Sequence, residues 1–438
     1  MTSASARPWR RAIAWLAFLG PFFFGSYGFA TWWTSRRQDV GAIVFEWERY
    51  VPFVPWTIVP YWSIDVFYAI SLFLCTTARE LDAHARRLLT AQIMAVTCFL
   101  AFPLRFTFTR PPAEGIPGAL FEILGSFDQP FNQAPSLHIA LLVILWALYA
   151  LHTRGVARWL VHAWGTLIGV SVLTTWQHHF VDVPTGALLG FFCLWLWPID
   201  RRSPVASMQW TRDSRRRQLA LRYALGAAAL AALAGATGGF ALWLLWPAVA
   251  CVLVACNYVA LGPGGFQKDA RGSISPGATA LLLPYLVAAS INARWWTRGQ
   301  PQAVLIADDV WLGRLPRRDE RGAANFAAIV DMTAELGFDP GHRSYTNLPV
   351  LDLVAADAAT LSRAARAIED ARRSGPVLVC CALGFSRSAS AVAAWLVASG
   401  RASDPEVAIA QVRAARPRVV LGDAHRAELV AASTALAR

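Results

Sequence analysis

The chain has 438 residues, of which 56% are hydrophobic and only 16% are charged. This composition excludes an ordinary soluble globular protein and also a disordered or collagen-like one, and it indicates that most of the chain lies in a bilayer. The net charge of +12 comes almost wholly from arginine, because Lys268 is the only lysine. The arginines fall at the ends of apolar runs, as anchoring against anionic lipid requires, so nucleic acid is not expected as a partner.

The first 200 residues contain six apolar runs that we expect to cross about 30 Å of hydrocarbon at 1.5 Å per residue. They lie near residues 12–33, 57–77, 88–108, 137–152, 157–176 and 180–198. Arginines cluster in every second connection, which the positive-inside rule assigns to the cytoplasm together with the N-terminus. We therefore predict an integral, multi-pass protein of a bacterial inner membrane, in which residues 1–200 form an all-α helical bundle with a six-helix core.

Residues 201–299 are expected to form a basic linker followed by two or three further membrane helices. Runs near 219–238 and 240–260 predict a helical hairpin that turns at two adjacent glycines. The third run, 277–293, is shorter, carries a proline and ends in tryptophans, so it predicts either another crossing or a helix in the membrane interface. We favour the interfacial alternative, since it leaves the rest of the chain in the cytoplasm, where a reactive thiolate stays reduced.

From about residue 300 the chain becomes charged, and 300–438 is long enough for one soluble domain with its own core. Its expected strands and helices lie, in chain order, at Val304–Ile306, Val310–Leu312, Leu361–Arg373, Pro376–Cys380 and Ser388–Ser399. The last two are an apolar strand and an alanine-rich helix joined by a tight loop. This order predicts a C-terminal α/β domain.

Ionisable residues cluster at the predicted outer ends of three membrane helices, where they are costly and therefore candidates for function. His178 and Asp182 are four residues apart, which puts them on one helix face. A carboxylate that accepts a proton from one imidazole nitrogen leaves the other nitrogen nucleophilic. His138 begins another helix and is suited to protonate a leaving oxygen. The set predicts phosphoryl transfer through a phosphohistidine, without a metal.

Three stretches in this order resemble the motifs of the type 2 phosphatidic acid phosphatase superfamily: Arg110-Pro111, Pro-Ser-Leu-His at 135–138, and His-x-x-x-Asp at 178–182. Leucine in place of glycine in the second motif looks like the branch that includes inositol phosphorylceramide and sphingomyelin synthases. The resemblance covers roughly residues 50–200. It implies that His178 is the nucleophile, that Asp182 orients it and that His138 is the acid. It also implies that phosphate is bound by Arg105, Arg110 and Ser136.

A second candidate site combines Cys381 and Arg387, which are separated by five residues between the apolar strand and the alanine-rich helix. A five-residue loop can turn its amide hydrogens around an oxyanion, the helix adds its positive end, and the arginine grips phosphate in a bidentate manner. The same field favours the thiolate, the form that attacks phosphorus. Gly384 suits a loop position where a side chain would block the approach.

The segment 381–388 resembles the dual-specificity branch of the cysteine-dependent protein tyrosine phosphatase superfamily, and the similarity extends over nearly all of 302–432. It implies an α/β cysteine phosphatase in which Cys381 is the nucleophile and Arg387 binds phosphate. It also implies that the Ser388 hydroxyl assists departure of the thiolate and that Asp352 is the general acid. Asp357 is the alternative acid. Cys380 stands where the family usually has histidine, which would alter the reactivity of the thiol or permit a reversible oxidation between the two adjacent cysteines.

The loop residues Ala382, Leu383 and Phe385 are uncharged, which favours a substrate with a single phosphate monoester. Two phosphoryl-transfer sites in one chain predict a bifunctional phosphatase or phosphotransferase of phospholipid head-group metabolism, with membrane lipids as partners and neither metal nor cofactor. One alternative is a membrane-anchored signalling phosphatase that acts on phosphoproteins, and another is a lipid transporter or scaffold with relic sites. Hydrolysis and head-group transfer stay open, because water and a lipid alcohol attack the same phosphohistidine.

Overall fold

The computed structural model describes residues 7–316 and 325–436. The chain divides into two compact units, Met1–Ser203 and Pro204–Arg438, and each is described by itself. The division into 1–200, 201–299 and 300–438 stays a prediction.

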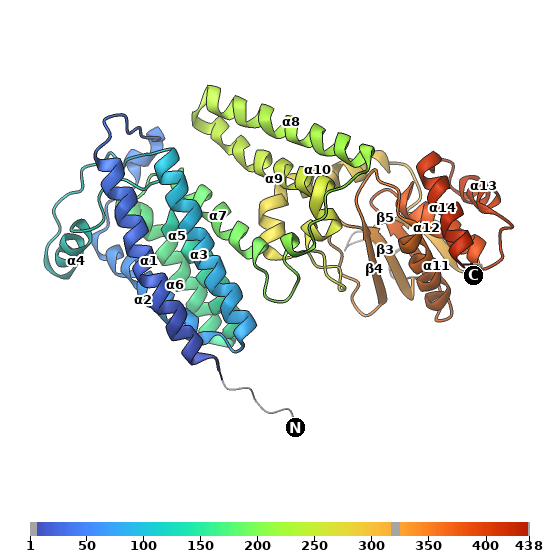
Figure 1. Ribbon diagram of the computed structural model, residues 1–438, viewed down its shortest axis with the longest axis horizontal. Helices are drawn as coiled ribbons and strands as arrows, with labels where there is room; N and C mark the ends of the chain where they lie inside the picture. The colour runs from blue at the N-terminus through green and yellow to red at the C-terminus, as the bar shows by residue number, and fades with distance from the viewer. Residues whose placement is uncertain (1–6, 317–324, 437–438) are drawn as a thin grey trace. The chain divides into compact units, whose positions relative to one another are not determined.

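The first unit is helical in its described part (Figure 1). Its helices are α1 (Trp9–Ser35), α2 (Ile58–Leu74), α3 (Ala78–Ala101), α4 (Gly115–Gly125), α5 (Leu137–His152), α6 (Gly155–Thr174) and α7 (Asp182–Leu196). Six of them fall on the six predicted runs, and α4 was not predicted. The predicted run 88–108 is wrong at both ends, because Thr77 caps α3 by accepting a hydrogen bond from the backbone N–H of Glu80, and the helix ends just before Pro103.

Helices α5 and α7 approach each other closely at a glycine. A Cβ atom on Gly186 of α7 would collide with the backbone carbonyl oxygen of Ser136 and would lie 3.0 Å from Cβ of Ile139. Small residues at helix contacts let two backbones come together in this way. The glycine therefore brings the start of α7 against the start of α5, where the predicted histidine site lies.

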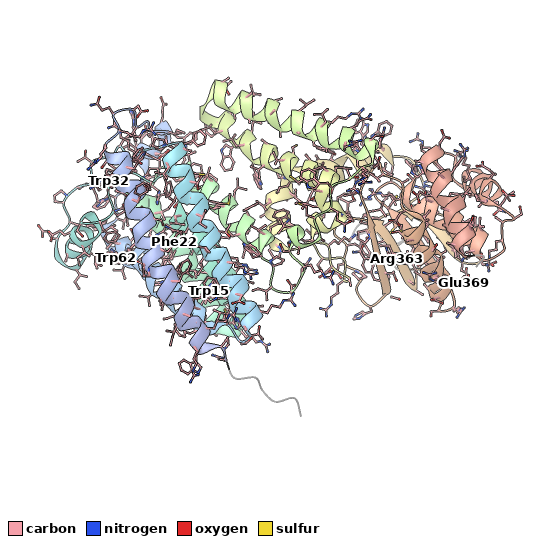
Figure 2. The ribbon with its side chains drawn as sticks, in the orientation of Figure 1. Trp15, Phe22, Trp32, Trp62, Arg363 and Glu369 are labelled. Carbon is pink, nitrogen blue, oxygen red and sulfur yellow. The ribbon has the colours of Figure 1, made fainter. Side chains whose placement is uncertain are left out.

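The outer surface of the first unit is strongly apolar. Phe18, Phe24 and Phe29 of α1 are 48%, 63% and 50% exposed, and Figure 2 labels further aromatic side chains along the same helix. By length and composition, six helices of the described chain are suited to cross a membrane: Trp9–Ser35, Pro55–Leu74, Gly155–Thr174, Ser214–Thr237, Gly239–Phe266 and Pro276–Trp296. The first three belong to this unit.

The second unit combines three apolar helices with an α/β fold (Figure 1). Its helices are α8 (Ser214–Thr237), α9 (Leu245–Cys256), α10 (Pro276–Trp296), α11 (Ala358–Arg372), α12 (Arg387–Ala398), α13 (Pro405–Ala415) and α14 (Asp423–Leu436). Its strands are β1 (Ala303–Ala307), β2 (Val310–Arg314), β3 (Ala328–Thr333), β4 (Ser344–Val350) and β5 (Val377–Cys381). Helices α8 and α9 form the predicted hairpin, with Gly238 and Gly239 at the turn.

The five strands form one mixed sheet in the order β1-β2-β5-β3-β4. Strand β1 is antiparallel to β2, and the remaining pairs are parallel. Helices α11 to α14 bury a core with Val379 and Trp395 on one face of the sheet, whereas Ala293 near the end of α10 packs with Ile329 and Leu378 on the other. The predicted α/β fold is confirmed, while neither β3 nor β4 was predicted as a strand.

Both ends of α10 contact the α/β fold. In the loop before the helix, Nζ of Lys268 donates to Oδ2 of Asp331 at 2.6 Å and to the hydroxyl and carbonyl oxygens of Thr333. At the other end, Ala293 packs against the sheet. The side chains of Lys268 and Asp331 are 1% and 0% exposed, so the loop is fixed by a buried ion pair. The loop before α10 and the end of the helix therefore both contact the α/β fold.

We expect Lys268→Met to destabilise the second unit, because it leaves the Asp331 carboxylate buried without its counter-charge. Removing one partner of a buried ion pair costs about 3–5 kcal/mol. Thermal unfolding of the full chain in detergent measures the effect. The matched control is Arg373→Met, which breaks a solvent-exposed pair with Asp370 and should change stability by about 0–1 kcal/mol. Equal stability of the two variants would contradict the assigned role of the buried pair.

Candidate active sites

A histidine, an aspartate and a serine meet where α5 and α7 begin. Nδ1 of His178 lies 3.1 Å from Oδ2 of Asp182, the first residue of α7. Nε2 of the same ring lies 3.2 Å from Oγ of Ser136, which also caps α5 by accepting a hydrogen bond from a backbone N–H. The side chains of His178 and Asp182 are 8% and 0% exposed. The buried carboxylate thus holds the ring orientation and leaves Nε2 on the side of Ser136.

The neighbouring His179 is engaged on both ring nitrogens. Its Nδ1 lies 2.8 Å from Oε2 of Glu48 and its Nε2 lies 3.1 Å from Oγ1 of Thr107. His178, by contrast, lines a cavity of about 180 Å³. Of the two adjacent histidines, His178 and not His179 therefore lines this cavity.

His138 lines the same cavity from the first turn of α5. Its ring stacks on Tyr61, with the centroids 4.1 Å apart and the planes 17° apart. Its Nε2 is buried and has no hydrogen-bond partner among the described residues. A buried nitrogen without a partner is costly, so this one is available to a substrate oxygen.

The two predicted arginine ligands do not line this cavity in the described part of the unit. Arg105 is exposed, and the guanidinium of Arg110 lies 4.7 Å from the ring centroid of Phe121. Neither is among the residues that line the cavity, whereas Asp65 and Asp128 are. The two carboxylates were missed because nothing in their sequence spacing connects them with the histidines, and the phosphate-binding role of the arginines stays a prediction.

The second site forms at the carboxyl edge of the parallel strands. Strand β5 ends at Cys381, Glu335 follows β3, and Asp352 follows β4. These strands are adjacent in the sheet. Because the carboxyl ends of parallel strands meet at one edge, residues far apart in sequence converge there, as is usual for sites in open α/β sheets.

The loop after β5 surrounds the thiol of Cys381. The backbone N–H of Gly384 and the hydroxyl of Ser388 each donate to Sγ at 3.2 Å. Gly384 has a φ of +73°, and a Cβ there would lie 2.5 Å from the backbone of Gly313. Helix α12 begins at Arg387, so its positive end also faces the loop. The loop amide, the Ser388 hydroxyl and the start of the helix therefore all face the sulfur. Only glycine at position 384 allows the loop this path.

Arg387 is bound by two carboxylates. Its Nη1 and Nη2 donate to the two oxygens of Glu335 at 2.8 and 2.7 Å, and Nη2 also donates to Oδ1 of Asp352 at 2.9 Å. Nη1 donates further to the carbonyl oxygen of Val350. Burial would raise the pKa of Glu335, but the Arg387 guanidinium offsets this and holds the pKa below its ordinary value. Burial, assisted by the nearby Glu335, raises the pKa of Asp352.

The hydrogen-bond capacity of Arg387 suggests how a phosphate enters. A guanidinium has five N–H donors. In Arg387 the N–H groups of Nη1 and Nη2 make four hydrogen bonds, two to Glu335, one to Asp352 and one to the carbonyl oxygen of Val350. Glu335 holds the group from behind in a bidentate pair. A substrate phosphate that binds Nη2 must take the position of the Asp352 carboxylate, which frees Asp352 to carry a proton. The raised pKa of Asp352 favours that protonated form.

Sequence reasoning missed Glu335 and Arg416. Glu335 directly follows a buried strand beside β5, which is the pattern that could have found it. Arg416 is 2% exposed, its Nη2 donates to the carbonyl oxygen of Leu383 in the loop, and its guanidinium lies 5.2 Å from the ring centroid of Phe385. Arg416 therefore supports the loop between Cys381 and Arg387, although it lies outside that segment of the sequence.

Two further predicted residues lie away from the thiol. Asp357 caps α11 by accepting a hydrogen bond from the backbone N–H of Thr360, so it has a structural role. Cys380 packs with Ile329 on the sheet face opposite to the core that contains Cys381, as neighbouring strand residues must. Both cysteines are free, and burial raises the pKa of the Cys380 thiol well above its ordinary value.

Residues 314–435 match the family model described as dual specificity phosphatase, catalytic domain. The C-terminal domain is a dual specificity phosphatase domain. The chain is similar to the crystal structure of Tk-PTP in the active form, with 28% identity over 31% of this chain and 97% of that one and a TM-score of 0.29. It is similar to human DUSP28, with 25% identity, coverage of 32% and 97%, and a TM-score of 0.27.

A structure of PTPMT1 in complex with PI(5)P shares 22% identity, with coverage of 31% and 97% and a TM-score of 0.29. No curated protein matches the chain. The family match makes the protein a phosphoric monoester hydrolase. The resemblance of the first unit to type 2 phosphatidic acid phosphatases stays a prediction.

We expect Cys381→Ser to lose essentially all hydrolysis of aryl phosphates by the full chain, because a serine hydroxyl in this loop is a far weaker nucleophile than a thiolate. A continuous assay with 4-nitrophenyl phosphate measures it. Cys380→Ala is the matched control, since it changes the adjacent thiol on the opposite sheet face, and it should retain activity. Turnover by the serine variant at the wild-type rate would refute Cys381 as nucleophile.

The phosphatase should lose kcat/KM for phenyl phosphate as the pH rises through the pKa of Asp352, because the leaving oxygen then receives no proton. Since that pKa is raised, the falling limb should lie above the range of an ordinary aspartate. Asp352→Asn should lower kcat/KM by about 10²–10⁴-fold, as for other general acids, and should abolish the falling limb. A falling limb that persists unchanged in this variant would assign the acid to another residue.

Proposed function

We propose that the protein is a bifunctional membrane enzyme of phospholipid head-group metabolism, in which the phosphatase removes a single phosphate monoester from a membrane-resident substrate. One observation carries this proposal. The hydroxyl of Tyr258, eight residues before the end of the apolar segment Gly239–Phe266, donates a hydrogen bond to the backbone carbonyl oxygen of Asp352. Because that segment has the length and composition of a membrane span, the acid of the phosphatase site would be at the membrane surface.

The membrane placement follows from charge and from α10. Arginines lie at the start of α8, at 212, 215, 216 and 217, which favours a cytoplasmic base for the α8–α9 hairpin. A helix of 21 residues is about 31 Å long, and the loop before α10 and the end of the helix both contact the same α/β fold. Such a helix would not cross a bilayer with that fold on one side, so we propose that α10 lies in the interface and that the phosphatase domain is cytoplasmic.

For the first unit we propose phosphoryl transfer through His178. Its Nε2 would attack phosphorus while Asp182 holds Nδ1, and His138 would protonate the oxygen that leaves. Water or a lipid alcohol would then release the phosphoryl group. The geometry that supports this is the bonded pair of His178 and Asp182 beside the unpartnered nitrogen of His138 at one cavity.

The alternative is a membrane-anchored phosphatase that acts on phosphoproteins, and the match to a dual specificity phosphatase domain is consistent with it. The uncharged loop at Ala382, Leu383 and Phe385 suits any single phosphate monoester. The two proposals differ in which molecules change in a cell, so lipid and phosphoprotein measurements on the same cells separate them.

We expect cells with His178→Ala or Asp182→Asn to lose a lipid phosphoryl transfer that wild-type cells perform, and cells with Cys381→Ser to accumulate a monophosphorylated lipid. Mass spectrometry of total lipids from cells expressing each variant measures both. Purified His178→Ala protein should hydrolyse aryl phosphates at the wild-type rate, because Cys381 is intact. Unchanged lipids in every variant, with phosphoproteins raised in the Cys381→Ser cells, would sink the lipid assignment and favour the signalling alternative.

A further inference from the structure

Three tyrosines from the three apolar helices of the second unit form one cluster. The rings of Tyr223 (α8) and Tyr258 stack with centroids 5.6 Å apart and planes 13° apart. Tyr285 of α10 meets Tyr223 edge to face at 5.8 Å. Tyr258 is 1% exposed, so its phenol is directed into the protein.

Tyr258 lies in a π-helical turn, Asn257–Leu261, that directly continues α9. Turns of this kind are rare and frequently mark functional sites. The backbone carbonyl oxygen of Tyr258 accepts a hydrogen bond from Nε of Arg216 at 3.0 Å. Ring stacking and this bond together fix the position of the phenol.

The Tyr258 hydroxyl reaches the chain beside the predicted acid. It donates to the backbone carbonyl oxygen of Asp352 at 2.9 Å, while the side chain of Asp352 binds Nη2 of Arg387 at 2.9 Å. The next residue, Leu353, has a φ of +58°, a conformation that non-glycine residues adopt only when the surroundings hold them. The bond from Tyr258 fixes the peptide plane between Asp352 and Leu353 and therefore the direction of the Asp352 side chain.

We propose that Tyr258 is a positioning residue of the Cys381 phosphatase: it holds the acid loop so that the Asp352 carboxyl reaches the oxygen that leaves. The residue lies outside the matched phosphatase domain, 314–435, so the catalytic unit includes the apolar helices. In the step concerned, Sγ of Cys381 forms a bond to phosphorus, the bond from phosphorus to the leaving oxygen breaks, and the proton of Asp352 passes to that oxygen. Loss of the Tyr258 bond impairs only the proton transfer.

Proton transfer matters for poor leaving groups and not for good ones. Phenoxide needs a proton to leave, whereas 2,4-dinitrophenoxide leaves without one. The value of kcat/KM covers the steps up to formation of the phosphocysteine, so it reports this difference directly. A variant that merely unfolds part of the enzyme lowers kcat/KM for both substrates by the same factor.

The test is Tyr258→Phe in the full chain in detergent, with Tyr223→Phe as the matched control, because Tyr223 belongs to the same cluster but does not bond Asp352 in the structure. Tyr258→Phe should lower kcat/KM for phenyl phosphate about tenfold, the effect of one lost hydrogen bond, and should leave kcat/KM for 2,4-dinitrophenyl phosphate at the wild-type value. Tyr223→Phe should keep the wild-type ratio between the two substrates.

The proposal rests on Asp352 as the acid, so Asp352→Asn is measured with the same two substrates. Selective loss with phenyl phosphate in Asp352→Asn but not in Tyr258→Phe would overturn the role of Tyr258 and leave the acid assignment standing. Equal loss with both substrates in Tyr258→Phe would also overturn it, since that result means a structural effect alone. No selective loss in Asp352→Asn would overturn both assignments.

Discussion

The buried guanidinium of Arg387 is the constraint on which the phosphatase site depends. A positive charge that is 2% exposed must be neutralised within the protein. Glu335 does this with both carboxylate oxygens, and Asp352 adds a third contact. The same contacts orient the guanidinium predicted to bind phosphate, and they hold the predicted acid, Asp352, against it. The contacts that neutralise the buried charge of Arg387 are thus the same contacts that orient its guanidinium.

The apolar helices of the second unit belong to that arrangement. The only lysine of the chain forms a buried ion pair with Asp331 of β3, and the end of α10 covers the sheet face opposite to α11 and α12. Through Tyr258 the helices also reach the loop that carries Asp352. A family match confined to 314–435 therefore understates what the site needs, because part of its support comes from residues that precede the domain in the chain.

In the first unit, too, one residue makes two contacts of the candidate site. A glycine lets the starts of α5 and α7 meet, and one aspartate then holds His178 by its side chain while its backbone carbonyl oxygen accepts the N–H of Ser136. His138 contributes a buried nitrogen without a partner from the same end of α5. Cys381 thus ends β5, whereas His178 lies in the loop before α7, so the predicted helix face shared by His178 and Asp182 is wrong. In each unit a buried carboxylate orients a group of the candidate site: Asp182 orients His178, and Glu335 orients Arg387.

The sequence by itself determined the local features: the apolar runs, and the strand, loop and helix around Cys381. These depend on residues close in the chain, whose periodicity and order carry the information. Only the tertiary structure decided that Glu335 binds Arg387, that Ala293 of α10 packs on the sheet, and that Tyr258 bonds to Asp352. Each of these contacts is made by strand order and helix packing, which bring together positions up to 94 apart in the chain. Contacts of this kind cannot be seen in the local spacing of residues.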